Sequence, residues 1–196
     1  MHKQLMMGAF AVFVSAGMIQ SLHAATDEGS SKKDDEVIRG RYLVTLGGCN
    51  DCHTPKNMTP QGPTPDMSRE LAGFPADKKL PEVPKDVIGP ARWGGLASDD
   101  LTAWVGPWGI SFAANLTPDE ETGLGSWSLE TFKLAMRTGR HKGDGRPILP
   151  PMPWYGLAPM TDDDLAAIFA YLKSIPAVKN KVPEPVAPDQ VHAPET

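Results

Sequence analysis

One short motif carries the residue types best suited to chemistry. Cys49, Cys52 and His53 follow a pair of glycines in the spacing C-x-x-C-H. This spacing is the attachment signature of a c-type haem. Two thiols three positions apart form thioethers with the vinyl groups of one porphyrin, and the adjacent imidazole ligates the iron. The motif therefore predicts one covalently attached haem c, held by both cysteines, with His53 as the proximal iron ligand.

Three other chemistries use a similar motif. A zinc site needs about four ligands, usually including further Cys or a His cluster, and the chain holds only 2 Cys. A thioredoxin-like redox pair needs a surrounding βαβ pattern, which the sequence does not show. A disulfide between Cys49 and Cys52 is geometrically feasible, but it leaves the adjacent His53 without a role. Covalent haem is the interpretation that uses all three residues.

The group on the opposite face of the iron decides what such a haem does. A methionine thioether favours ferrous iron and suits an electron carrier, whereas an open position permits ligand binding or oxygen chemistry. Met152 lies in the run Pro150-Pro151-Met152-Pro153, and the prolines stiffen the loop that holds its sulfur. We expect Met152 to be the sixth ligand, with Met160 as the second choice. The remaining candidates are Met58, Met67, Met136, His141 and His192. Of these, Met136 is expected to fill the core.

The N-terminus has the pattern of a secretory signal. Met1-His2-Lys3 is a basic start, residues 5–18 are a mainly apolar run, and Ser21-Leu22-His23-Ala24-Ala25 ends in a small-residue cleavage site. This succession predicts a signal peptide over residues 1–24. The apolar run is too short for a comfortable membrane span, so the mature chain is expected to lack a transmembrane segment. Export predicts a periplasmic location, in agreement with haem attachment outside the bacterial cytoplasm.

The charge balance limits the class of partner. A formal net charge of -5 at pH 7 argues against nucleic acid and anionic membranes. It is compatible with docking to a redox protein that presents a basic patch.

Apolar periodicity predicts three helices after the signal. The first begins at Asp34 or Asp35 and ends at Gly47-Gly48. The second follows Ser128. The third follows Thr161 as N-cap, and three acids in its first turn suit the helix dipole.

The segment between the first two helices has a different character. Residues 54–110 are rich in Pro and Gly but also contain Trp93, Trp104 and Trp108, which disordered segments rarely carry. We expect an ordered, irregular wrap over the haem and the core. Residues 101–113 are compatible with either a small β-hairpin or a short helix, and the two stay open. The predicted fold class is all-α, with the small β-hairpin left open as the one exception.

With these residues assembled, the chain resembles a class I c-type cytochrome domain over roughly residues 36–176. The likeness rests on Gly40-Arg41-Tyr42-Leu43, the C-x-x-C-H motif and Ala170-Tyr171-Leu172-Lys173. It implies a cytochrome c fold in which the N- and C-terminal helices cross, with Gly40 meeting Tyr171. Together with the signal pattern and the composition of the two ends, the predicted organisation is a signal peptide (1–24), a flexible leader (25–35), a cytochrome c domain (36–176) and a Pro-rich tail (177–196).

More narrowly, the chain is similar to monohaem modules in cytochrome subunits of bacterial alcohol and aldehyde dehydrogenases and of related molybdenum hydroxylases. The motifs that carry this likeness are residues 115–119, 125–128, 137–139 and 151–154. The likeness implies that Asn115, Trp127 and Arg137 lie near the haem or its propionates. Ordinary packing or helix capping is the alternative for each. Such subunits often carry three haems, whereas this chain has one C-x-x-C-H motif.

The resulting prediction is an electron-transfer protein and not an enzyme. It would carry single electrons from a dehydrogenase to another cytochrome or a terminal oxidase. One alternative is a haem enzyme or gas sensor with an open sixth position, which needs a distal acid–base group such as His141 or Asp144. Another is a tightly bound electron-entry subunit of a dehydrogenase complex.

Overall fold

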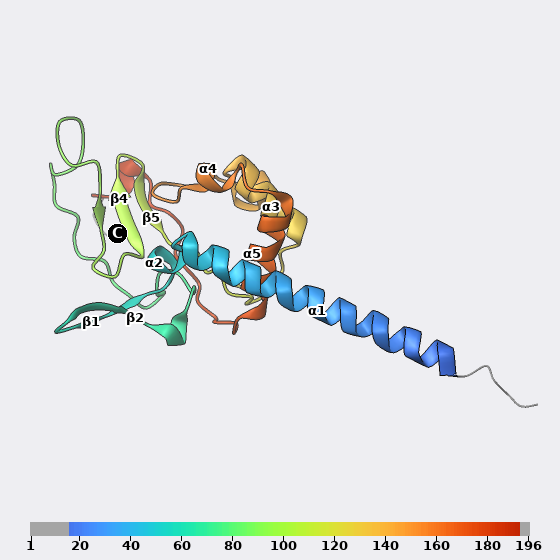
Figure 1. The fold of residues 1–196 in the computed structure, drawn as a ribbon. Coiled ribbons are helices and arrows are strands. Elements are labelled where there is room, and N and C mark those ends of the chain that lie inside the picture. Colours follow the sequence, from blue (N-terminus) through green and yellow to red (C-terminus); the bar gives the residue numbers. More distant parts are fainter. Residues whose placement is uncertain (1–15, 193–196) are drawn as a thin grey trace, which may run out of the picture. The chain divides into compact units, whose positions relative to one another are not determined.

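The computed structural model describes the backbone of residues 16–192 and the side chains of residues 31–192 (Figure 1). The predicted signal peptide over residues 1–24 therefore lies mostly outside the described residues. The contacts divide the chain into two units, Met1–Asp35 and Glu36–Thr196, and the second unit contains the C-x-x-C-H motif. Among the described helices, none has the length and apolar character that crossing a membrane requires.

Five α-helices are present in the part of the chain that the structure describes. They are α1 (Ala16–Leu46), α2 (Cys49–His53), α3 (Leu129–Thr138), α4 (Trp154–Leu157) and α5 (Asp162–Ser174). Short 3-10 turns lie at η1 (Met67–Arg69), η2 (His141–Gly143) and η3 (Pro188–Gln190). Helix α1 begins well before the predicted start at Asp34 or Asp35, because no proline interrupts the preceding segment.

The later helices begin after Ser128 and Thr161 as predicted, and the predicted cap at Thr161 is confirmed. The Ser128 side chain accepts a hydrogen bond from the Thr131 amide at the start of α3, and Gly139 ends that helix at φ 64°. Thr161 accepts from the Asp164 amide at the start of α5. These side chains satisfy amides that the first helical turn leaves without partners.

The apolar core lies between α3, α5 and the end of α1. Its buried members include Val44, Phe132, Leu165, Leu172 and Met136, the last as predicted. Gly40 lies directly against α5. A Cβ at this position would come within 1.8 Å of the Ala167 carbonyl oxygen and 2.8 Å of the Tyr171 Cβ, so only glycine permits the two helices to approach this closely.

The all-α prediction is wrong, because the Pro- and Gly-rich segment forms two antiparallel sheets. Strands β1 (Lys56–Thr59) and β2 (Gly62–Pro65) pair with each other. Strands β3 (Leu96–Ala97), β4 (Ala103–Gly106) and β5 (Gly109–Phe112) form a three-stranded sheet in the order β3-β4-β5. Turn residues end each strand and reverse the chain, which favours hairpins over helices. The β4–β5 pair is the hairpin considered for residues 101–113, and the helix alternative is not formed.

The C-terminal segment is bonded to the body of the unit. We call residues 177–186 the strap. Val186 pairs with Ile110 on β5 through two main-chain hydrogen bonds of 2.9 and 3.0 Å. Gly109 allows this contact, since a Cβ there would lie 2.0 Å from the Val186 carbonyl oxygen. The strap thus adds to the edge of the three-stranded sheet.

A buried carboxylate organises the turn before β4. Asp100, with 2% of its surface exposed, accepts hydrogen bonds from the hydroxyls of Ser98 and Thr102 at 2.7 and 2.9 Å. Lys78 lies 2.9 Å from the same carboxylate. Burial raises the pKa of Asp100, but the hydrogen bonds and the lysine charge outweigh it, so the pKa lies below its ordinary value. The carboxylate is therefore ionised and fully partnered.

Replacing Asp100 with asparagine should lower the free energy of unfolding at pH 7 by about 3 kcal/mol, because Lys78 is left half-buried without its buried partner. A carboxylate with a depressed folded pKa stabilises the fold above its unfolded pKa of about 3.9 and loses that contribution as pH falls through the folded value. The difference between wild type and variant should therefore shrink below about pH 4. Urea unfolding at pH 7 and pH 3 measures it.

The matched control for this prediction is Asp99→Asn. Asp99 also pairs with Lys78, but its side chain is 59% exposed, so solvent screens the pair and its loss should cost less than about 1 kcal/mol. Equal losses for the two variants would contradict the role given to burial.

Candidate functional site

The C-x-x-C-H motif forms a short helix of its own. Gly48 adopts φ 64° and reverses the chain between α1 and α2, where Figure 1 shows the two helices in succession. Cys49 and Cys52 are spaced by three residues on α2, which brings their side chains to one side of the helix. Both are free thiols and both are half-buried. Cys49 also packs against the apolar core.

His53 ends this helix with its imidazole buried at 8% exposure. Its Nδ1 lies 2.8 Å from the Ala114 carbonyl oxygen. A carbonyl only accepts, so Nδ1 carries the proton and Nε2 keeps its lone pair. Burial lowers the pKa of His53, more than the hydrogen bond to Ala114 raises it, and the Lys56 charge lowers it further. The side chain is therefore a neutral imidazole in the tautomer that metal-ligating histidines use.

Two backbone segments, around Gly73 and around Ala113–Ala114, hold the end of α2 by hydrogen bonds. The Gly73 amide donates to the His53 carbonyl at 2.8 Å, and the Phe74 amide donates to the Ala113 carbonyl at 2.9 Å. The segment around Gly73 therefore bonds both to α2 and to the stretch that holds the imidazole through Ala114. Sequence reasoning missed these residues, because the contacts join positions far apart in the chain.

Thr54, which follows His53, adds two further hydrogen bonds at the end of α2. Its hydroxyl donates to Asn50 Oδ1 at 2.7 Å and accepts from the Leu71 amide at 2.9 Å. Thr54 has no exposed surface, so both bonds are shielded from water. The end of α2 is consequently fixed through side chain and backbone alike.

The electrostatics of the motif keep its thiols protonated. Burial raises the pKa of Cys49, and it raises the pKa of Cys52 more than the nearby Lys56 charge lowers it. The Lys56 ammonium donates to the carbonyls of Asp51 and Thr54, the latter at 3.0 Å. Thiols with raised pKa values are poor nucleophiles at neutral pH.

Met152 lies on a different part of the chain, between η2 and α4, and is half-buried. Its loop is attached to the three-stranded sheet. The Ser111 hydroxyl donates to the Pro150 carbonyl at 2.5 Å and accepts from Trp108 Nε1 at 3.2 Å. The structure thus brings Cys49, Cys52 and His53 together on one helix, while Met152 as an iron ligand stays a prediction.

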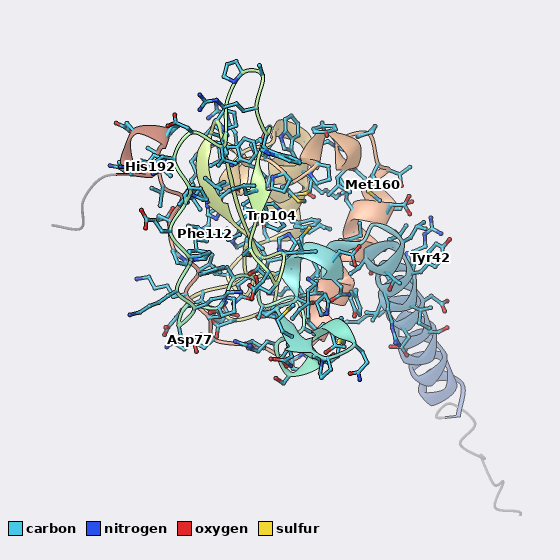
Figure 2. The ribbon with its side chains drawn as sticks, turned by 90° about the vertical axis from the view of Figure 1, so that its left-hand side faces the viewer. Tyr42, Asp77, Trp104, Phe112, Met160 and His192 are labelled. Atoms are coloured by element: carbon cyan, nitrogen blue, oxygen red, sulfur yellow. The ribbon has the colours of Figure 1, made fainter. Side chains whose placement is uncertain are left out.

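The other sulfur candidates differ in their surroundings. Met160 is half-buried and packs against the apolar core, and Figure 2 places it among the helices, away from Trp104 and Phe112 on the sheet. Met58 and Met67 are 58% and 60% exposed, so neither is held by surrounding side chains.

The residues placed near the haem by family likeness are engaged with the chain itself. Asn115 is buried, and its Nδ2 donates to the Val178 carbonyl at 2.8 Å. Arg137 pairs with Asp162 at 2.7 Å and donates to the Ala158 carbonyl. Trp127 packs against the core and meets His141 edge-on. For Asn115 and Arg137 these contacts favour the packing and capping alternative.

Comparison with known proteins shows the class that this chain resembles: the cytochrome c subunits of bacterial dehydrogenases. No protein-family model matches the chain. One relative is the cytochrome c subunit of the quinone alcohol dehydrogenase of Gluconobacter oxydans, 39% identical over 77% of this chain. Another is the gluconate 2-dehydrogenase cytochrome c subunit of Pantoea cypripedii, 27% identical over 81% of this chain. A third is a subunit of the nicotinate dehydrogenase of Pseudomonas putida, 32% identical over 74% of this chain.

These relatives confirm the predicted likeness to cytochrome subunits of dehydrogenases. They also agree with an electron-transfer protein rather than a catalytic subunit, because two of the three carry the name cytochrome c subunit. The chain spans only 24%, 27% and 9% of the lengths of these three proteins. The resemblance therefore concerns a part of each relative.

Proposed function

We propose that the chain is a periplasmic monohaem c-type cytochrome that carries single electrons. Cys49 and Cys52 would hold the porphyrin as thioethers, and His53 and Met152 would ligate the iron. When bound, the haem supplies reversible one-electron exchange. The observation that carries the proposal is His53, whose buried imidazole has Nδ1 engaged by Ala114 and Nε2 available, directly beside two free thiols.

The contribution of the chain itself is to hold the ligand still. The hydrogen bonds to the imidazole and to the carbonyl of His53 fix both ends of this residue. An electron carrier benefits from such a fixed ligand, because little rearrangement then accompanies a change of charge on the iron. The two thiols are half-buried. A porphyrin attached to them would therefore keep one edge accessible to a redox partner.

The proposed donor is a dehydrogenase, and the proposed acceptor is another cytochrome or a terminal oxidase. The names of the relatives support the donor. They also favour a second candidate, a tightly bound electron-entry subunit, since each relative is named as a subunit. Copurification of a large dehydrogenase with the native protein at high salt would favour the bound subunit over a diffusing carrier.

The proposed processing rests on the sequence pattern. Residues 1–24 would be removed on export, residues 25–35 would form a leader, and residues 177–196 would follow the cytochrome c domain at 36–176 as a Pro-rich segment whose first part, the strap, is bonded to that domain. The division of contacts between Asp35 and Glu36 supports the start of that domain.

The experiment that tests the proposal is the ferric absorption spectrum of the haem-loaded protein. We expect wild type to show the weak far-red band of iron–methionine charge transfer, and Met152→Ala to lose it completely. Met160→Ala is the matched control and should retain the band. Loss of the band only in Met160→Ala would move the sixth ligand to Met160. Absence of the band in wild type would contradict methionine ligation and favour an open sixth position.

A further inference from the structure

The strap carries an asparagine whose side-chain amide makes three hydrogen bonds. Asn180 is half-buried. Its Nδ2 donates to the carbonyls of Ala72 and Phe74 at 2.7 and 2.8 Å, and its Oδ1 accepts from the Ala76 amide at 2.9 Å. All three partners belong to one short segment. No other side-chain type supplies two donors and an acceptor in this flat, compact arrangement except its longer homologue glutamine.

The strap also holds a second segment. The Val178 amide donates to the Thr117 hydroxyl at 3.1 Å, and its carbonyl accepts from Asn115 Nδ2 at 2.8 Å. The backbone amide of Asn180 donates to the Thr122 hydroxyl at 3.0 Å. The strap is therefore tied to residues 72–76 through the side chain of Asn180 and to residues 115–122 through its backbone.

Both of these segments lead to His53. Between Ala72 and Phe74, the Gly73 amide donates to the His53 carbonyl at 2.8 Å. Just before Asn115, the Ala114 carbonyl accepts from the imidazole Nδ1 at 2.8 Å. The backbone of His53 is thus held by one segment and its ring by the other. The two segments also bond to each other, since the Phe74 amide donates to Ala113.

We propose that Asn180 is a positioning residue for His53, an inference that rests on His53 being the proximal haem ligand. The Asn180 carboxamide holds residues 72–76 in place. Those residues hold the end of α2 and the Ala113–Ala114 stretch, and the Ala114 carbonyl sets the plane of the imidazole. Removing the carboxamide frees the carbonyls of Ala72 and Phe74, and the orientation of His53 relaxes with them. The orientation and hydrogen bonding of an axial histidine tune the iron that it ligates.

The experiment uses the full-length, haem-loaded protein and three variants. Asn180→Asp keeps the size and the acceptor for Ala76 but replaces both donors with an acceptor. Asn180→Ala removes all three bonds. Asn57→Ala is the matched control, because Asn57 lies exposed on β1. The readouts are the proton NMR shifts of the ferric haem methyls, which report the plane of the axial histidine, and the equilibrium constant for one-electron reduction.

We expect both Asn180 variants to redistribute the methyl shifts and to change the reduction equilibrium constant by at least about threefold, while Asn57→Ala matches wild type. If Asn180→Asp folds and loads haem but leaves shifts and equilibrium unchanged, Asn180 is merely structural and the inference is overturned, even when urea unfolding shows lower stability. If Asn180→Ala does not fold, the methyl shifts and reduction equilibrium of Asn180→Asp alone test the inference.

Failure of the proposed function gives a different result. A wild-type protein without thioether-bound haem, or one whose methyl shifts and spectrum survive His53→Ala, would overturn the cytochrome assignment and the inference together. The inference alone is overturned if the wild-type protein carries thioether-bound haem and loses its methyl shifts and spectrum in His53→Ala, while the Asn180 variants leave the methyl shifts and the reduction equilibrium unchanged.

Discussion

Replacing His53 with alanine should abolish the six-coordinate spectrum of the haem-loaded protein and reduce the yield of that protein by at least about tenfold. The variant loses the proposed proximal ligand and also the hydrogen bond to the Ala114 carbonyl, which is left without its donor. Expression with a haem-attachment system, followed by absorption spectra and a covalent-haem stain, measures both effects.

The control for this prediction is His192→Ala. His192 is exposed, and its removal should leave spectrum and yield unchanged. If His53→Ala keeps a wild-type spectrum, His53 is not an iron ligand, and the assignment of the site to electron transfer fails with it.

The second large effect, on both stability and the haem spectrum, is expected when Gly73 is replaced by alanine. This residue has φ 78°, a conformation that costs a residue with a Cβ about 1–2 kcal/mol. A Cβ would also lie 2.4 Å from the Ala113 carbonyl oxygen and 2.6 Å from that of Ala114. The backbone strain and these close contacts together should lower the free energy of unfolding of Gly73→Ala by about 3–4 kcal/mol. The Ala114 oxygen that a Cβ would displace holds the His53 ring. The substitution should also alter the spectrum of the loaded protein.

Gly62→Ala separates the two causes of that loss. Gly62 also has a positive φ, at 109°, but a Cβ there would meet no atom within 4 Å. Its substitution should cost only the backbone contribution of about 1–2 kcal/mol and leave the spectrum unchanged. Chemical unfolding of both variants makes the comparison, and equal losses would show that the contact with Ala113 and Ala114 is relieved at little cost.

The sequence predicted the features that depend on local chemistry. The cap at Thr161 was predictable, since a hydroxyl before a helical pattern is a signal contained within four residues. Gly40 lies against Tyr171 as the family likeness implies. The C-x-x-C-H motif likewise identified three candidate site residues from spacing alone, and the structure places them on one short helix.

The features that were missed depend on distant partners. Strand β2 reads Gly-Pro-Thr-Pro, which has neither β-branched alternation nor apolar periodicity, and it forms only because β1 pairs with it. The Ala114 carbonyl that orients His53 is 61 residues away from it in sequence. A Pro-rich tail pattern gave no sign that Asn180 bonds across the chain, because an asparagine between charged residues is typical of loops.

The position of Asn180 near the C-terminus has a consequence for the order of assembly. The residue is separated from Ala72 by 108 positions, so the ribosome completes the cysteine motif long before it adds the strap. Folding during synthesis generally proceeds from the N-terminus onward. Under the proposed export, the thiols would leave the translocation channel before the strap is complete, and the bonds that tie the strap to the segments around Gly73 and Ala114 would form only after synthesis is nearly finished. Truncation just before residue 177 would keep Gly73 and Ala114, which contact His53, and would remove the strap bonds that hold their two segments.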